Sequence, residues 1–145
     1  MGILCSMLKA PIALMTAGIV GLAACQAAPK ADITSTQMVI DLSDYRVTPN
    51  LQTLKAGKAK IGVRNTAGMV HEVVLLKTDT AADKLQVDGG SAKAKEEGTK
   101  VASVLNLGSG GVAAMDVDLT PGSYVLICNI AGHYQLGMRS AFKVE

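Results

Sequence analysis

This chain contains little histidine and few aromatic residues. Its 145 residues include two histidines, three tyrosines, one phenylalanine and no tryptophan. A core with so few large rings must be filled mainly by Val, Leu, Ile and Ala, and abundant β-branched residues favour strands over helices. Two histidines are also too few for an enzyme that holds several metal ions, since each ion needs its own set of ligands.

Charged residues are also scarce, because Asp, Glu, Lys and Arg make up 18% of the chain, and its formal net charge is +2. Nucleic-acid binding depends on a dense basic surface, so we expect no nucleic-acid partner. The length fits one domain. Apolar residues, at 49% of the chain, supply enough material for a core and argue against disorder.

The first 24 residues have the pattern of an export signal. Lys9 precedes an apolar run, residues 10–24, which is too short and too rich in small residues for a transmembrane helix. We therefore expect a signal peptide over residues 1–24 and an exported protein, in the periplasm or at the cell surface.

The end of this signal, Leu22-Ala23-Ala24-Cys25, resembles the lipobox of bacterial lipoproteins, in which the cysteine is acylated and becomes the first mature residue. The resemblance predicts a lipid on Cys25 that anchors the protein to a membrane. A flexible tether over residues 25–35 is expected to follow the lipid. The alternative is an ordinary signal peptide that is cleaved nearby, with Cys25 incidental.

The cysteines leave one thiol without a partner. If Cys5 is removed with the signal and Cys25 carries lipid, Cys128 has no cysteine with which to form a disulfide. A lone thiol in an oxidising compartment must be buried, reactive or bound to a metal. An inert buried cysteine that acts as a small hydrophobic residue is the default alternative.

Three potential metal ligands follow one another at equal spacing near the C-terminus. Four residues separate Cys128 from His133, and four separate His133 from Met138. Thiolate and thioether ligands together favour copper, and a trigonal site of two histidines and a cysteine with a weak axial methionine is used for electron transfer. The second histidine, His71, begins an apolar run, where a histidine is more often structural than a ligand when considered alone.

Alternating apolar and polar residues, separated by Gly and Pro turns, predict strands. The predicted strands cover residues 36–43, 58–65, 71–77, 101–105, 112–119, 124–128 and the C-terminal run to Glu145. The chain is expected to continue extended from Tyr45 to Pro49. Residues 71–77 are almost continuously apolar, which indicates a central strand covered on both faces. We expect an all-β Greek-key sandwich of about seven to eight strands over residues 36–145.

Two further segments complete this prediction. Leu119 to Tyr124 resembles the tyrosine corner of Greek-key sandwiches, in which the phenol bonds to upstream backbone. Tyr124, Leu126 and Cys128 then share the core face, so the thiol points inward. The long excursion over residues 78–111 contains a possible helical turn at residues 79–85, and its charged run is expected to be a solvated face rather than a docking site.

The spacing of Cys128, His133 and Met138, with Gly132 before the histidine, resembles the cupredoxin or type 1 blue copper family, most closely its rusticyanin-type and sulfocyanin-type members. The resemblance covers residues 36–145. It implies one copper ion per chain, cycling between Cu(I) and Cu(II), bound by His71, Cys128, His133 and Met138. It also implies that His71 is buried and His133 exposed.

The resemblance further implies a one-electron carrier without catalytic residues, which acts as a monomer. Its partner would be another redox protein, a cytochrome or an oxidase, that docks on a surface of low charge around His133. Two positions depart from common relatives: Glu72 follows His71 where plastocyanin and azurin have Asn, and Ala131 replaces a frequent Pro. Neither position is a ligand.

Two other functions remain as alternatives. A periplasmic copper chaperone or copper-resistance protein would favour several exposed Met and His residues, whereas Met38, Met69, Met115 and Met138 are scattered along the chain. Met69, two residues before His71, is the one hint of an auxiliary ligand. A copper enzyme would need further ligands that two histidines do not supply.

Overall fold

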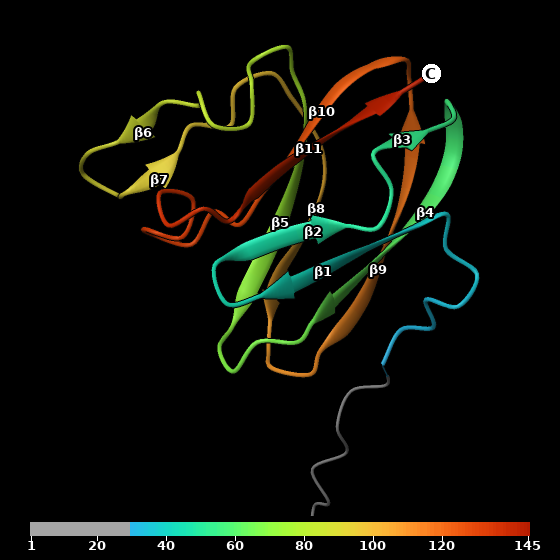
Figure 1. The fold of residues 1–145 in the computed structure, drawn as a ribbon, viewed down its shortest axis with the longest axis horizontal. Helices are drawn as coiled ribbons and strands as arrows, with labels where there is room; N and C mark the ends of the chain where they lie inside the picture. The colour runs from blue at the N-terminus through green and yellow to red at the C-terminus, as the bar shows by residue number, and fades with distance from the viewer. Residues whose placement is uncertain (1–29) are drawn as a thin grey trace, which may run out of the picture.

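The computed structural model describes residues 30–145, which fold into eleven strands. The strands are β1 (Met38–Ser43), β2 (Arg46–Pro49), β3 (Thr53–Leu54), β4 (Gly57–Asn65), β5 (His71–Lys77), β6 (Val87–Asp88), β7 (Lys93–Ala94), β8 (Thr99–Leu107), β9 (Val112–Leu119), β10 (Gly122–Ile127) and β11 (Arg139–Val144). One sheet has the order β2-β1-β4-β9, a second has the order β3-β11-β10-β5-β8, and β6 pairs with β7 alone (Figure 1).

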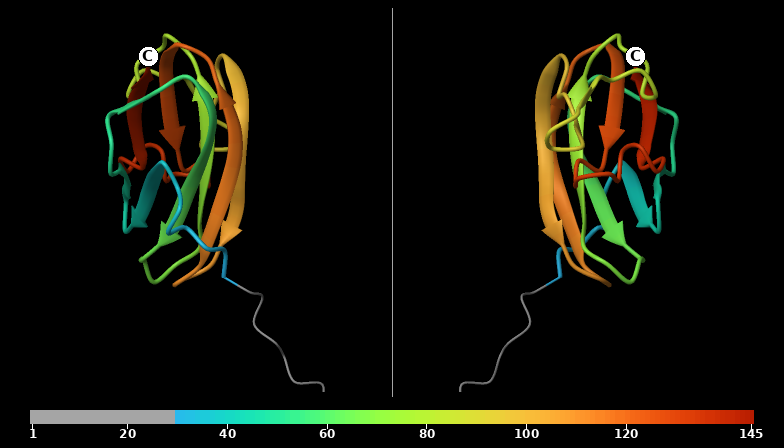
Figure 2. Two further views of the ribbon diagram at one scale, coloured as in Figure 1. Left: turned by 90° about the vertical axis from the view of Figure 1, so that its right-hand side faces the viewer. Right: turned by 90° about the vertical axis from the view of Figure 1, so that its left-hand side faces the viewer.

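The two larger sheets form a β-sandwich, so the predicted all-β Greek-key fold is confirmed. Figure 2 shows the strands of both sheets lying roughly along the same axis, as in aligned sheet packing. The strand number exceeds the expected seven to eight because β3, β6 and β7 contain only two residues each. The described residues contain no helix with the length and hydrophobicity needed to cross a membrane.

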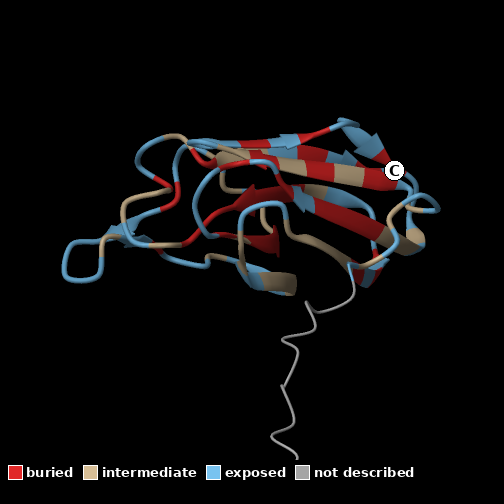
Figure 3. Ribbon diagram, turned by 90° about the horizontal axis from the view of Figure 1, so that it is seen from below, coloured by how far each residue is buried: buried red, intermediate tan, exposed pale blue. Residues whose placement is uncertain are grey.

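The core between the sheets is built from the inward positions of alternating strands. Met38, Ile40 and Leu42 of β1 are buried, and the residues between them are only partly so. Leu126 of β10 and Cys128, just after this strand, belong to the same buried cluster as these three residues of β1. Figure 3 shows buried residues concentrated along the strands and exposed residues in the loops. The predicted inward position of Cys128 is therefore correct.

A second, smaller apolar cluster lies on the outer face of the five-stranded sheet. Val74 and Leu76 of β5 belong to it, whereas Val73 and Leu75 of the same strand belong to the main core. Leu85 and Ala94, from the long excursion, cover this outer face. The continuous apolar run of β5 is explained by this burial on both faces.

Three local predictions can be compared with the structure. The phenol of Tyr124 donates to the carbonyl of Thr120 at 2.8 Å and accepts from its N–H at 3.1 Å, which confirms the tyrosine corner. The chain does not continue extended through residue 45, because β2 folds back antiparallel on β1 after Asp44 and Tyr45. Over residues 79–85, where the sequence indicates a possible helical turn, one turn forms, closed by the bond from Lys84 N to Ala81 O, and no longer helix follows it.

The segment before β1 lies against the four-stranded sheet. The amide of Ala31 donates to Val112 O at 3.4 Å. A Cβ added at Gly62 would lie 2.8 Å from Cβ of Ile33, so only glycine leaves room for this segment. The predicted signal peptide, residues 1–24, and the predicted lipid site at Cys25 lie outside the described residues.

Candidate metal centre

His71 is the first residue of β5, and an irregularity in the neighbouring strand lies beside it. His71 pairs with Leu107, and Val73 pairs with Val104, so β8 has one extra residue at this point. Asn106, within the extra stretch, has a positive φ of 54°. Such β-bulges re-aim side chains and often occur next to functional sites.

A buried asparagine fixes the turn that precedes His71. The side-chain amide of Asn65 donates to the carbonyls of Met69 and Leu107, each at 2.8 Å. Its oxygen accepts from the N–H of Ala67 at 3.0 Å. Asn65 therefore joins the β4–β5 turn to the end of β8, the two segments on either side of His71.

The other three predicted ligands lie on the loop between β10 and β11. Backbone hydrogen bonds close this loop on itself: Cys128 N donates to Met138 O at 2.9 Å, and Met138 N donates to His133 O at 3.1 Å. His133 N donates to Ile130 O at 3.0 Å. The backbone thus gathers all three side chains at the end of the sandwich.

The donor atoms of His71, Cys128 and His133 converge within 4.8 Å of one another. The two Nδ1 atoms lie 3.2 Å apart, and Sγ of Cys128 is 3.5 Å from Nδ1 of His133 and 3.9 Å from Nδ1 of His71. At the metal–ligand bond lengths typical of zinc, two nitrogen ligands of one metal lie less than about 4 Å apart. A nitrogen and a sulfur ligand of one metal lie less than about 4.3 Å apart. All three separations meet this limit.

Burial shifts the pKa values of His71 and Cys128 in opposite directions. His71 has 0% of its surface exposed, and burial, with a smaller effect of His133, lowers its pKa, so the ring stays neutral with a lone pair available. Burial raises the pKa of the Cys128 thiol, while the N–H of Glu72, 3.5 Å from Sγ, acts in the opposite direction. A bound metal would deprotonate this thiol.

Met138 is also fully buried and shares the main core cluster with Cys128. Two imidazole nitrogens, one thiolate and a thioether form the donor set typical of blue copper sites. His71, Cys128, His133 and Met138 are thus positioned to bind one copper ion. His133 is the more exposed histidine, whereas His71 is buried, as the family resemblance implied.

Two exposed apolar side chains lie near His133. The ring of Tyr45 packs edge-on against the His133 ring, with centroids 6.4 Å apart, and 43% of its surface is exposed. Leu136, on the ligand loop, is 59% exposed. Tyr134, which follows His133 in the chain, is instead buried in the outer apolar cluster.

Sequence reasoning missed the polar residues that support the ligands, above all Asn65, Asn129 and Tyr134. Asn129 follows Cys128 and binds the backbone of Ala94. Each of the three carries a polar group that is buried among apolar neighbours. Buried polar groups need partners, so an amide or phenol within an apolar run is the signal that the sequence offered.

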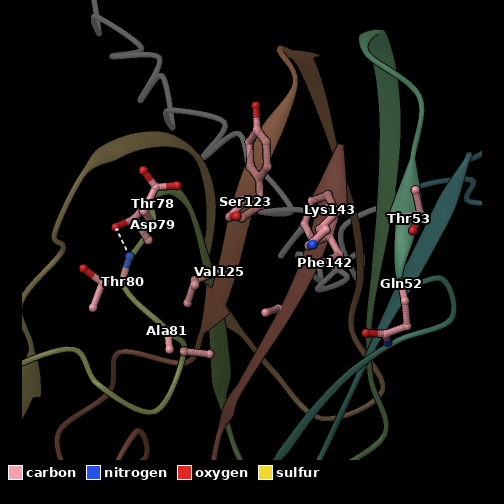
Figure 4. A pocket seen from close by; sticks show the side chains of 13 residues that line it. Gln52, Thr53, Thr78, Asp79, Thr80, Ala81, Ser123, Val125, Phe142 and Lys143 are labelled. Atoms are coloured by element: carbon pink, nitrogen blue, oxygen red, sulfur yellow. Dashed lines mark hydrogen bonds between the residues drawn. The ribbon is translucent and has the colours of Figure 1, made fainter. Parts of the chain in front are cut away.

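A separate groove of about 470 Å³ lies on the outer face of the five-stranded sheet. Figure 4 shows Thr78, Asp79 and Thr80 on one side of it and Gln52 and Thr53 on the other. Its lining contains small and polar side chains and none of the four predicted ligands. The groove is therefore not part of the metal centre.

Solved structures with the same fold include an auracyanin and a rusticyanin. Reduced auracyanin from Roseiflexus castenholzii is 21% identical with a TM-score of 0.54, covering 74% of this chain and 94% of that chain. Rusticyanin from Thiobacillus ferrooxidans is 19% identical with a TM-score of 0.51, covering 74% of this chain and 75% of that chain. No curated protein sequence matches this chain.

A family model gives the assignment directly. The model for copper binding proteins of the plastocyanin/azurin family matches residues 31–145, which includes all four predicted ligands. The match covers the whole sandwich and most of the chain. The protein therefore belongs to the plastocyanin/azurin family of copper binding proteins, and it is a cupredoxin of the blue copper type.

Proposed function

We propose that this protein carries single electrons through a mononuclear type 1 copper site and is not an enzyme. The observation that supports this proposal is the convergence of Nδ1 of His71, Nδ1 of His133 and Sγ of Cys128 at one end of the sandwich. Sites of two histidines and a cysteine with a weak axial methionine serve electron transfer.

In this mechanism His71, Cys128 and His133 would hold the copper ion, with Met138 as a fourth, weaker ligand. Copper supplies the one-electron couple between Cu(I) and Cu(II). His71, Cys128 and Met138 are buried and keep water away, whereas His133 reaches the surface and gives the electron its route. The backbone hydrogen bonds that close the ligand loop would keep the ligand side chains in place in both oxidation states.

The experiment that tests this proposal is addition of Cu(II) to the metal-free domain, followed by visible and electron paramagnetic resonance spectroscopy. We expect intense blue or green colour from thiolate-to-copper charge transfer, which Cys128→Ser abolishes. A serine variant that keeps the colour would disprove the assignment of the thiolate.

The copper chaperone alternative is not favoured. A protein that hands over Cu(I) presents accessible methionines, but Met38, Met115 and Met138 are buried in the core. Among methionines of the described residues, only Met69 is exposed, at 41%. Titration with Cu(I) separates the two functions, because a chaperone would exchange its copper readily with a competing chelator.

We also propose that a redox protein, a cytochrome or an oxidase, docks around His133 on the monomeric carrier. Support comes from the exposed Tyr45 and Leu136, which give this surface an apolar character. Apolar interface centres with few charges are typical of protein contacts. Leu136→Lys is expected to slow electron transfer without altering the copper spectrum.

Export with a lipid anchor at Cys25 remains part of the proposal and rests on the lipobox-like sequence before it. One acyl chain binds membranes only marginally, so a stable anchor needs the several chains of a bacterial lipoprotein. Fractionation of cells that express Cys25→Ser tests this point. We expect release of the variant from membranes, and continued tight association would favour an uncleaved signal anchor.

A further inference from the structure

The segment over residues 78–98, which carries β6 and β7, is hydrogen-bonded to the ligand loop at three places. Each place is directly next to a proposed ligand: Asn129 follows Cys128, and Gly132 and Tyr134 flank His133. Figure 1 shows β7 beside the red loop between β10 and β11. The chain separation is large, so the fold rather than local sequence creates these contacts.

The first contact is a two-bond clasp between a side-chain amide and a peptide unit. Oδ1 of Asn129 accepts from the N–H of Ala94 at 2.8 Å, and Nδ2 of Asn129 donates to the carbonyl of Ala94 at 3.0 Å. Both residues are buried. If Asn129 and Ala94 separated, the oxygen and nitrogen of the side-chain amide and the N–H and carbonyl of Ala94 would lose these partners while buried away from water. Such a loss is costly in free energy. The backbone immediately after Cys128 is thereby fixed to β7.

The second contact joins two residues whose backbones have positive φ angles. The N–H of Gly132 donates to the carbonyl of Ala92 at 2.8 Å. Gly132 has a φ of 82° and Ala92 a φ of 52°. An alanine adopts this conformation only at an energetic cost, and here the conformation accompanies a hydrogen bond to the residue before His133.

The third contact is made by a buried phenol. The hydroxyl of Tyr134 donates to the carbonyl of Ala82 at 2.8 Å and accepts from the N–H of Leu85 at 3.0 Å. On the other side, the guanidinium of Arg139 lies 5.2 Å from the Tyr134 ring centroid and donates to the Tyr134 carbonyl at 2.7 Å. Tyr134, the residue after His133, is thus bonded both to segment 78–98 and to Arg139, the residue after Met138.

We propose that segment 78–98 positions the ligand loop, and that Asn129 and Tyr134 are its positioning residues. The segment holds Cys128 and His133 at a fixed separation in the metal-free protein and in both copper oxidation states. An apolar cover for β5 needs only Leu85 and Ala94, whereas the hydrogen bonds described above end next to ligands. The copper part of this proposal rests on the proposed function, but the order of the metal-free loop does not.

The fold offers a matched control for the test. Tyr124 is also buried, and its hydroxyl also donates to one carbonyl and accepts from one N–H, but at the tyrosine corner, which contains none of the proposed ligands. Tyr134→Phe and Tyr124→Phe therefore remove equivalent bonds while keeping the rings. Asn129→Ala provides an independent test at the Cys128 end of the loop.

The first measurement is amide hydrogen exchange of the metal-free protein, with the exchange of residues 129–138 compared with that of the core strands. In Tyr134→Phe we expect exchange in this loop to accelerate at least about tenfold relative to the core, because two hydrogen bonds that order the loop are lost. Tyr124→Phe should lower the stability of the whole domain without this selective effect.

The second measurement is made on the copper-loaded proteins. Tyr134→Phe and Asn129→Ala should shift the visible and paramagnetic resonance spectra and slow electron self-exchange, whereas Tyr124→Phe should leave both unchanged. If all three variants lose stability but keep the exchange pattern and spectra of the parent, the segment is only a cover for the sheet and the proposal is wrong. If the parent gives no blue copper spectrum, the proposed function fails, and the metal-free exchange experiment still decides the positioning proposal.

Discussion

The two buried ionisable ligands make the stability of the metal-free protein depend on pH in opposite directions. Burial lowers the pKa of His71 from its ordinary value of 6.5, so the unfolded state binds a proton more readily than the folded state. Stability is therefore lost as the pH falls below 6.5 towards the lowered value. Burial raises the pKa of Cys128 above its ordinary value of 9.0, so stability is also lost as the pH rises through 9.0.

Urea unfolding of the metal-free protein at about pH 5, 7.5 and 10 tests this prediction, with maximum stability expected at the middle value. His71→Gln removes the titrating ring, so its stability should change less between the two lower pH values. Equal acid sensitivity in the parent and the variant would show that other groups dominate. Cys128→Ser should likewise lose less stability than the parent at the highest pH.

The axial position gives a second prediction at the scale of one residue. A thioether is a soft ligand that favours Cu(I), and an axial methionine bond is long and weak. Met138→Gln replaces it with a harder oxygen donor, so we expect the variant to keep copper and to have a lower reduction potential. His71→Ala should damage the site more, since it removes an equatorial ligand.

Cyclic voltammetry and copper analysis of the two variants test this order of effects. Met138 is fully buried, so the overall stability of each variant must be measured beside its copper content. Complete loss of copper from a folded Met138→Gln variant would contradict the weak axial role.

Among the elements, strands with regular alternation were predictable from sequence, and contacts between distant segments were not. The alternation in β1 indicates burial of one face, and the continuous apolar run of β5 indicates burial of both faces. The turn at Asp44 and Tyr45 carries no glycine or asparagine, the usual residues at positive φ, although Tyr45 has a φ of 60°. Only Ser43 and Asp44, which are common turn residues, indicate a reversal of the chain there.

The same distinction applies to the site. Cys128, His133 and Met138 share one loop, so their spacing identified them, and His71 followed as the remaining histidine. The clasp between Asn129 and Ala94 joins residues 35 apart in sequence. Its geometry depends on the path of the whole segment 78–98, in which Gly89-Gly90 marks a turn but no residue pattern predicts where the segment packs.

Asn65 provides a prediction about how elements are joined. Its buried side chain links the β4–β5 turn to β8 through hydrogen bonds to Met69, Leu107 and Ala67. Asn65→Ala leaves those backbone groups without partners, so we expect a loss of about 2–4 kcal/mol in the free energy of unfolding. Asn50 is a matched control, because its exposed side chain accepts one bond, from Val39 N at 2.8 Å.

Chemical denaturation of both variants measures these losses, and Asn50→Ala should cost less than about 1 kcal/mol. Since Asn65 borders the His71 turn, copper should also dissociate faster from Asn65→Ala than from the control. Equal losses of stability in the two variants would show that burial of Asn65 has no special effect.

At the scale of the whole molecule, the small net charge makes association weakly dependent on salt. The chain has a formal charge of +2, and removal of Lys9 with the predicted signal leaves +1. Long-range steering depends on the interaction between the net charges of the two partners. Oxidised and reduced copies of this protein should therefore exchange electrons at a rate that changes little with ionic strength, if they meet through the apolar surface around His133.

Measurement of self-exchange by nuclear magnetic resonance line broadening, at about 0.05 M and 0.5 M salt, tests this prediction, and we expect less than about a threefold change. Leu136→Lys places a positive charge on each of the two contacting surfaces, so it should slow exchange at low salt and restore it partly at high salt. Lys93→Glu changes an exposed charge on β7 and should have little effect. If Lys93→Glu alters the rate strongly and Leu136→Lys does not, the copies meet through segment 78–98, and the docking surface around His133 is wrong.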